Sequence, residues 1–312
     1  MSPWKTVGLI GTGLIGGSMA LDIRACHLAD TLLGYDKKDG NAAAAQRLGI
    51  VDRIVSYEEL VAESDLIILS IPASAAAALL PDILDRLAAR VARQTPDGLG
   101  PDASGSISVT PGPERASLPV VLDVCSVKQP IVDAVRKHPF RGRFVAGHPM
   151  SGTEYSGPQA ARQGLFEGKV GIVCDAQDSD ADALACVEAL YEALGMRLVK
   201  MSAEQHDIHT AYVSHLSHVI SFSLALTVLD KEKDDKHIFD LASGGFSSTA
   251  RLAKSNADMW VPIFESNREN LLPVIDAYSD YLSRFRSAIA SADGPKLRSL
   301  IETANRIQKI IQ

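Results

Sequence analysis

The stretch Val7-Gly8-Leu9-Ile10-Gly11-Thr12-Gly13-Leu14-Ile15-Gly16-Gly17-Ser18 passes from an apolar run through a glycine loop into a helical run that ends near Ala25. This order predicts a strand, a tight turn and a helix. Gly11 permits the turn, Gly13 lets the backbone approach a pyrophosphate, and Gly16 lets the helix pack closely on the strand. Unpaired N–H groups at the start of that helix favour phosphate groups. The stretch therefore predicts a dinucleotide site.

A second apolar run, residues 31–35, ends in Asp36, about 20 residues beyond the last glycine of the loop. An acid at this spacing presents its carboxylate to the adenosine ribose and repels a 2′-phosphate. NAD is therefore favoured over NADP, a preference moderated by Lys37 and Lys38. The alternative is that Asp36 is an ordinary turn residue. The predicted cofactor-binding residues are Gly11, Gly13, Leu14, Ile15, Gly16, Asp36, Ser70 and Pro72.

Apolar runs alternate with helical runs along residues 1–202, which predicts an α/β domain with a Rossmann-type, doubly wound and mainly parallel sheet. The unbroken apolar run at 64–72 suits a strand that is covered on both faces. Residues 93–119 are dense in Gly, Pro, Ser and Asp, which predicts a long surface loop. The other predicted strands are 31–35, 120–125, 144–147, 170–174 and 198–201, and the predicted helices are 14–25, 41–48, 73–91, 130–137 and 180–194.

No strand pattern follows residue 202, so residues 203–312 are predicted to form an all-helical domain. Residues 211–229 are apolar around most of the helix circumference, which predicts burial on all sides. Because such burial calls for a further covering surface, we expect this domain to mediate homodimerisation. A last helix is indicated by apolar residues at helical spacing, namely Leu297, Leu300, Ile301, Ala304, Ile307 and Ile311.

The amino-acid composition indicates which kinds of macromolecule the protein does not bind. The 312 residues are 46% hydrophobic and carry a net charge of −7, which argues against nucleic acid or a membrane surface as partner. The N-terminus has no signal pattern, and no uninterrupted apolar run reaches the ~18 residues of a membrane span, so we expect a cytoplasmic protein. No metal is predicted, because the cysteines lack metal-ligand spacing. They are Cys26, Cys125, Cys174 and Cys186.

Two polar residues directly follow predicted strands, where open α/β sheets bind their ligands. These are Ser126 and His148. A neutral imidazole can accept a proton from a substrate hydroxyl, so His148 is the candidate general base. The alternatives are structural: Ser126 with Gln129 fits a capping box, and His148 could simply bond to backbone. Cys125, beside Ser126, is either a reactive thiol or, the favoured interpretation, a packed core residue.

The helical half holds two further polar clusters, Ser214-His215-Leu216-Ser217-His218 and the segment 244–251 that ends in Arg251. Polar residues on an apolar helix need partners, which neighbouring helices or a substrate would supply. The guanidinium of Arg251 suits a carboxylate, although arginine is more often a solvated surface residue.

Taken together, these motifs resemble the prephenate dehydrogenase family, which includes arogenate and cyclohexadienyl dehydrogenases. The resemblance covers nearly the whole chain and rests on 11–18, Asp123-Val124-Cys125-Ser126-Val127-Lys128, 147–154, 214–218 and 249–253. It implies oxidative decarboxylation of prephenate to 4-hydroxyphenylpyruvate with hydride transfer to NAD, in tyrosine biosynthesis. The loop at 93–119 is longer than the family usually carries, and we expect no C-terminal regulatory domain.

The same resemblance implies roles for individual residues. It implies that His148 is the catalytic histidine and that Ser126 orients the substrate hydroxyl. It also implies that Arg251 binds a carboxylate of the substrate. The implied pocket residues are Ser214, His215, His218, Thr153 and Trp260, of which Trp260 would come from the partner in an interlocked dimer.

Several alternatives stay open. Arogenate differs from prephenate by an amino group in place of a keto group. The candidate acids for binding that amino group are Glu154 and Asp207. A β-hydroxyacid dehydrogenase would place a lysine on its long helix, and residues 214–229 contain none. A dinucleotide-sensing protein without turnover is disfavoured by the combination of His148, Ser126 and Arg251.

Overall fold

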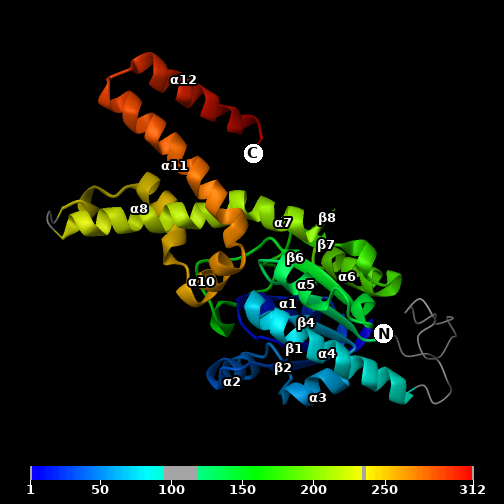
Figure 1. Ribbon diagram of the computed structural model, residues 1–312. Coiled ribbons are helices and arrows are strands. Elements are labelled where there is room, and N and C mark those ends of the chain that lie inside the picture. Colours follow the sequence, from blue (N-terminus) through cyan, green and yellow to red (C-terminus); the bar gives the residue numbers. More distant parts are fainter. Residues whose placement is uncertain (1, 95–117, 234–236, 311–312) are drawn as a thin grey trace.

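The computed structural model describes residues 2–94, 118–233 and 237–310 (Figure 1). The predicted surface loop at 93–119 lies almost entirely outside these residues, as does Ile311 of the predicted last helix. The described residues form a sheet domain, followed by helices of which α11 (Arg268–Ala290) and α12 (Gly294–Ala304) project away from the sheet.

Eight described strands form one sheet in the order β3-β2-β1-β4-β5-β6-β7-β8. All neighbouring strands are parallel except β6 and β7, which are antiparallel. The prediction of a doubly wound, mainly parallel sheet is confirmed. The strands are β1 (Trp4–Ile10), β2 (Ala29–Tyr35), β3 (Arg53–Ile54), β4 (Leu66–Leu69), β5 (Val120–Asp123), β6 (Phe144–Pro149), β7 (Val170–Cys174) and β8 (Arg197–Met201).

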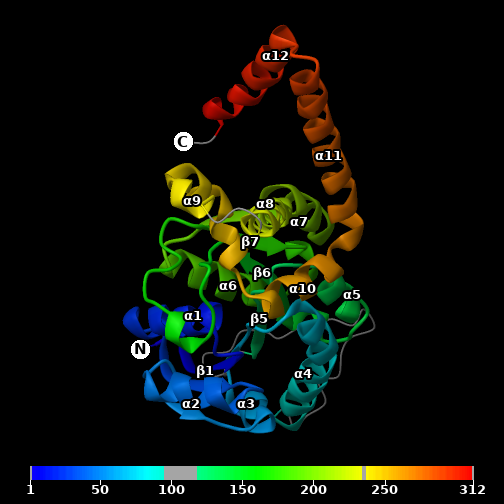
Figure 2. The same ribbon diagram turned by 90° about the vertical axis from the view of Figure 1, so that its left-hand side faces the viewer.

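Helices cover both faces of the sheet, as Figure 2 shows for α1 and α4. Buried side chains of the strands divide between two hydrophobic clusters, one on each face. The first cluster includes α3 (Tyr57–Glu63), α4 (Ala73–Gln94) and α5 (Gln129–Val135), and the second includes α1 (Leu14–Ala25), α2 (Asp39–Arg47) and α6 (Ala181–Ala193). The strand order reverses between β1 and β4, so the carboxyl ends of these strands mark the crevice where such sheets bind ligands.

Described elements after Met201 are helical. A capping box between Ser202 and Gln205 starts α7 (Ala203–Thr210), which continues through a π-helical turn into α8 (Leu216–Glu232). The remaining helices are α9 (Gly244–Ala250) and α10 (Ala257–Ser266), with short 3-10 segments at Arg141–Arg143, Pro158–Ala160, Ala176–Asp178, Phe239–Leu241, Arg251–Lys254 and Asn305–Lys309.

The long helix is far less covered than its composition predicts. Of the residues of α8 only Ser221 is buried, while Leu226 and Leu229 are 62% and 49% exposed. By length and composition alone, Ala203–Glu232 would also be long and apolar enough to cross a membrane, with 11% of its most apolar window buried. One helix of this kind is weak evidence for a membrane span, and Ser and His residues interrupt its apolar run. Burial on all sides is wrong for the single chain.

Candidate active site

The glycine loop has the geometry that a dinucleotide requires. Gly11 adopts a φ of 95°, and a Cβ there would collide with the carbonyl oxygen of Ser70. A Cβ on Gly16 would collide with the carbonyl oxygen of Gly11, so both glycines are needed for the close approach of β1, α1 and the end of β4. In contrast, a Cβ on Gly13 would have no neighbour within 4 Å in the described structure. The open space there, at the start of α1, fits the phosphates of a dinucleotide.

Asp36 lies beside this loop, directly after β2. Its Oδ2 accepts hydrogen bonds from the backbone N–H of Thr12 (3.0 Å) and from the Thr12 hydroxyl (3.1 Å), and its Oδ1 accepts from Lys38 N–H (2.9 Å). These bonds fix the carboxylate next to the turn that would hold the phosphates. The position is that of a ribose-binding acid.

His148 occupies the carboxyl end of β6 and is only 9% exposed. Its Nδ1 lies 2.7 Å from Nε2 of His206, whose Nδ1 lies 2.7 Å from Oδ1 of Asp207. Burial lowers the pKa of His148 well below its usual value, and the nearby positive charges of His206, when protonated, and Lys128 lower it further. His148 is therefore a neutral imidazole at cellular pH, as a proton acceptor must be.

A buried ion pair anchors the strands on which these groups stand. Lys128 and Asp123 are both fully buried, and the Lys128 ammonium pairs with the Asp123 carboxylate. The same ammonium donates a hydrogen bond of 2.6 Å to the carbonyl oxygen of Gly147, the residue before His148. The pair therefore ties the end of β5 to the end of β6 beside His148.

The polar cluster of the long helix faces the same region. The buried Nδ1 of His215 lies 3.1 Å from the amide Nδ2 of Asn267, which also donates to the Asp207 carbonyl oxygen (2.7 Å). The Asp207 carbonyl oxygen can only accept, so the Asn267 atom between it and His215 must be the donor Nδ2, and neutral His215 then carries its proton on Nε2. Burial lowers the pKa of His215 to about 4. When His215 is protonated, its positive charge lowers the pKa of His148, so the two imidazoles lie close enough to interact electrostatically.

His218 and Trp260 form one stacked unit within a single chain. Their ring centroids lie 3.4 Å apart, and His218 donates from Nδ1 to the carbonyl oxygen of Ser214 at 3.0 Å. The resemblance implied a Trp260 from the partner subunit, whereas in the structure it packs against the long helix of its own chain. The Trp260 indole Nε1 is buried and has no hydrogen-bond partner among the described residues, which leaves a donor available.

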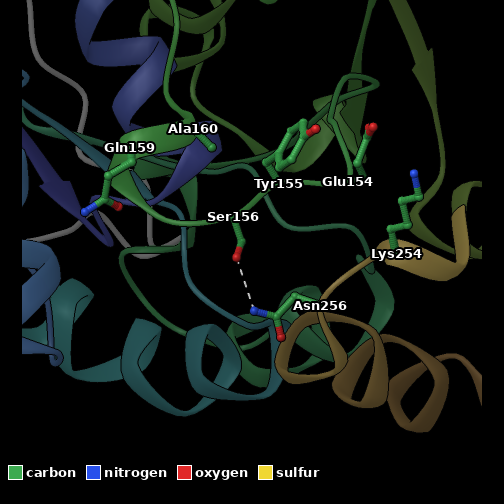
Figure 3. A pocket seen from close by; sticks show the side chains of 7 residues that line it. All are labelled: Glu154, Tyr155, Ser156, Gln159, Ala160, Lys254 and Asn256. Atoms are coloured by element: carbon green, nitrogen blue, oxygen red, sulfur yellow. Dashed lines mark hydrogen bonds between the residues drawn. The ribbon is translucent and has the colours of Figure 1, made fainter. Parts of the chain in front are cut away.

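Arg251 lies farther out and is paired with Glu154. Arg251 Nη1 is 3.5 Å from Glu154 Oε2, and 53% of the arginine side chain is exposed. A pocket of about 730 Å³ adjoins this pair between the loop after β6 and the segment before α10 (Figure 3). Its lining residues are Glu154, Tyr155, Ser156, Gln159, Ala160, Lys254 and Asn256, and Asn256 donates to the Ser156 hydroxyl across it.

Comparison with known proteins agrees with this arrangement. Residues 116–200 match the nucleotide-binding domain of prephenate dehydrogenase and residues 202–303 match its dimerization domain, while residues 6–92 match the coenzyme F420-dependent NADP oxidoreductase family. The chain is 31% identical to a prephenate dehydrogenase of Bacillus subtilis over 96% of its own length and 74% of that protein.

The chain belongs to the prephenate dehydrogenase family.

Other relatives span the substrate classes of the family. A cyclohexadienyl dehydrogenase of Zymomonas mobilis is 30% identical over 95% of this chain and 92% of its own. The crystal structure of prephenate dehydrogenase from A. aeolicus, in complex with hydroxyphenyl propionate and NAD+, has a TM-score of 0.77 at 28% identity, and 98% of each chain is covered. Arogenate dehydrogenase from Synechocystis has a TM-score of 0.71 at 25% identity and covers 98% of this chain and 100% of its own.

The structure overturns the capping-box interpretation of Ser126. Helix α5 starts after Lys128, and the carboxylate of Asp207 accepts the N–H groups of Lys128 and Gln129, each at 2.8 Å. The Ser126 hydroxyl, partly exposed between β5 and α5, makes no hydrogen bond to any described residue. It is free to bind a ligand, and the helix start is satisfied from another element.

Three further expectations are refined. Burial raises the pKa of the Cys125 thiol far above its usual value, and the thiol donates to the Ile71 carbonyl oxygen at 3.2 Å, so it is a packed residue. Asp207 is 1% exposed and engaged as described, so it is not free to read a substrate amino group. The Thr153 hydroxyl accepts from Tyr155 N–H at 3.2 Å in the loop that carries Glu154.

The residues that sequence reasoning missed are those that support His148. His206 and Lys128 are 0% exposed and Asn267 is 2% exposed. His206 contacts the His148 ring directly, and Lys128 donates to the carbonyl oxygen of Gly147, the residue before His148. Asn267 donates to the carbonyl oxygen of Asp207, which in turn contacts His206. The sequence carries one signal, the adjacent pair His206 and Asp207, which lies five residues beyond the end of the last predicted strand.

Proposed function

We propose that this protein catalyses the NAD-dependent oxidative decarboxylation of prephenate to 4-hydroxyphenylpyruvate in tyrosine biosynthesis. The observation that carries the proposal is the buried, neutral His148 at the carboxyl end of β6, on the edge of the sheet that holds the glycine loop and Asp36. NAD, when bound, supplies the hydride acceptor. The A. aeolicus relative, crystallised with NAD+ and a hydroxyphenyl ligand, supports the same pairing of cofactor and substrate.

In the proposed reaction the hydride leaves the ring carbon that bears the 4-hydroxyl, and His148 takes the hydroxyl proton. The bond from the ring to the carboxylate then breaks, carbon dioxide departs, and the electron pair of that bond makes the ring aromatic. The proton returns from His148 to the phenolic oxygen, so the overall products are 4-hydroxyphenylpyruvate, carbon dioxide and NADH. Ser126, whose hydroxyl is free, orients the 4-hydroxyl. An acceptor at that oxygen stabilises the transition state more than the ground state.

The other end of the substrate is assigned to Arg251. A guanidinium binds a carboxylate with two charge-assisted hydrogen bonds, and Arg251 already holds the Glu154 carboxylate at 3.5 Å. A substrate carboxylate would replace Glu154 as its partner. His215 and His218 with Ser214, together with Thr153 and Trp260, form the remaining wall of the proposed substrate pocket.

We also propose that the working unit is a homodimer. The residues that match the family's dimerization domain include most of the exposed apolar side chains of the described structure. Among them are Leu226, Leu229, Leu282, Ile289 and Ile301, each at least 49% exposed. A second chain would cover them, and a monomeric mass at micromolar concentration would contradict the assignment.

Arogenate is the second candidate substrate. Glu154 places a carboxylate at the pocket, 21% exposed, where it could pair with an amino group. Initial NADH formation with prephenate and with arogenate, each with NAD and with NADP, separates the candidates. We expect prephenate with NAD to be fastest. Preference for arogenate would keep the mechanism and change the substrate, and no turnover in any combination would overturn the function.

A further inference from the structure

The hydrogen bonds behind His148 permit one arrangement of protons. Asp207 stands at their end, and its carboxylate is 1% exposed and surrounded by donors. Oδ1 faces the N–H of Lys128 and Nδ1 of His206, while Oδ2 faces the N–H of Gln129. Burial raises the pKa of Asp207, and the two backbone donors oppose that rise. The two backbone N–H groups, one on each carboxylate oxygen, stabilise the ionised form of Asp207, and an ionised carboxylate only accepts hydrogen bonds. Nδ1 of His206 therefore carries a proton.

This fixes the next ring nitrogen. His206 is fully buried, and burial together with the charge of Lys128 lowers its pKa to about 2, so it holds a single ring proton. With that proton on Nδ1, its Nε2 presents a lone pair to Nδ1 of His148, 2.7 Å away. The partner atom must donate, because two lone pairs at that distance would repel. His148 thus carries its proton on Nδ1 and has a lone pair on Nε2.

We propose that Asp207, acting through His206, sets the tautomer of His148 and so makes its Nε2 the proton acceptor of the reaction. His206 and Asp207 are positioning residues, since neither needs to touch the substrate. This inference rests on the function proposed above, in which His148 receives the 4-hydroxyl proton. The opposite tautomer would present an N–H at Nε2 and could not take that proton.

The same carboxylate also sets the position of Ser126. Asp207 holds the first two N–H groups of the turn that starts α5, and Ser126 lies two residues before Lys128 on that turn. One buried acid therefore aligns the two groups proposed to meet the substrate hydroxyl. The separate contact from Asn267 gives His215 the opposite tautomer, with Nε2–H as a donor. The two imidazoles therefore carry opposite tautomers, with an acceptor at Nε2 of His148 and a donor at Nε2 of His215.

The first test reads the tautomer itself. In protein labelled with 15N-histidine, long-range 1H–15N correlations distinguish a protonated ring nitrogen from a bare one, and the His148 signals are those lost in His148→Asn. We expect Nδ1–H and a bare Nε2 in the wild-type protein at neutral pH. Observation of Nε2–H there would overturn the proposal. This reading needs no turnover, so it stands apart from any failure of the proposed function.

The second test uses kinetics with prephenate and NAD. His206→Leu removes the acceptor for His148 Nδ1–H, and we expect kcat to fall roughly 10²–10⁴-fold with little change in KM. His206→Gln keeps an oxygen acceptor near the same place, and we expect it to recover at least 10-fold of that loss. His209→Gln, an exposed position on the same helix, is the matched control and should keep wild-type rates.

The kinetics of the two His206 variants distinguish a positioning role from a purely structural one. A His206→Leu protein that keeps kcat within about threefold of wild type would refute the positioning role. So would equal losses in His206→Leu and His206→Gln, because a purely structural defect would not distinguish a side chain that accepts from one that does not. If His206→Leu does not fold, the wild-type spectrum and His206→Gln still decide the matter.

Discussion

Replacing Lys128 by Met tests the physical basis of the site most sharply. The Lys128 ammonium is fully buried, pairs with Asp123 and donates to the Gly147 carbonyl oxygen at 2.6 Å. Asp123 raises the pKa of Lys128, so the ammonium stays charged. Methionine has nearly the same length and no charge. It leaves Asp123 buried without a counter-charge, and the second oxygen of that carboxylate already has no hydrogen-bond partner among the described residues.

The magnitude follows from the burial of both partners. Breaking a buried pair by removing one charge costs about 3–5 kcal/mol, whereas a change at an exposed lysine stays within about 0.5 kcal/mol. Lys128→Met should therefore lower the free energy of unfolding by about 3–5 kcal/mol. Lys137→Met, two residues beyond the end of α5 and exposed, is the matched control. The double variant Asp123→Asn with Lys128→Met removes both charges and should recover a large part of the loss.

Urea unfolding followed by circular dichroism, at one protein concentration and several pH values, measures these differences. In Lys128→Met the unpaired Asp123 has a raised pKa in the folded state. The folded protein then takes up a proton at a pH where unfolded aspartate does not, so the deficit shrinks as the pH falls. A loss below about 1 kcal/mol at pH 7, or a double variant less stable than the single one, would show that the Lys128 ammonium does not stabilise the buried Asp123 carboxylate.

Three other predictions concern catalysis. His148→Asn should lower kcat roughly 10²–10⁴-fold with a modest change in KM in the NADH assay, and near-normal turnover would remove His148 from the role of base. Because burial holds the pKa of His148 well below 6.5 and the neutral ring is the active form, kcat/KM should show no decline as the pH falls from 8 to 6.5; a decline centred near 6.5 would contradict the burial of the base. Arg251→Ala should raise KM for prephenate about 10- to 100-fold, as expected for loss of one charge-assisted partner, and an unchanged KM would place the carboxylate elsewhere.

The parts of the fold that could be predicted from sequence are those with strong local signals. The glycine loop and the unbroken apolar strands gave the parallel sheet, because turn geometry and burial on two faces constrain each short segment by itself. The two-residue strand β3 and the seven-residue helix α3 were missed, since segments so short have almost no periodicity. The apolar composition of α8 was real, yet its covering surface is not in the single chain.

Of the candidate site, only the residues with a local sequence signal could be predicted. His148 and Ser126 could be predicted because each lies at or just beyond the carboxyl end of a strand. His206 lies 58 residues from His148 in the sequence, and only the packing of α7 against the sheet brings them together. Lys128 is hidden from sequence reasoning because lysine is almost always exposed, and only the neighbouring Asp123 makes its burial tolerable.

The most direct measurement is a crystal structure of this protein with NAD+ and hydroxyphenyl propionate, the ligand of the A. aeolicus relative. We expect the ligand hydroxyl to lie about 2.6–3.2 Å from Nε2 of His148 and near the Ser126 hydroxyl, with the ligand carboxylate on Arg251. His148 Nδ1 should still face His206. A ligand bound with its hydroxyl away from His148, or with its carboxylate beside His148, would contradict the role of His148 as the proton acceptor.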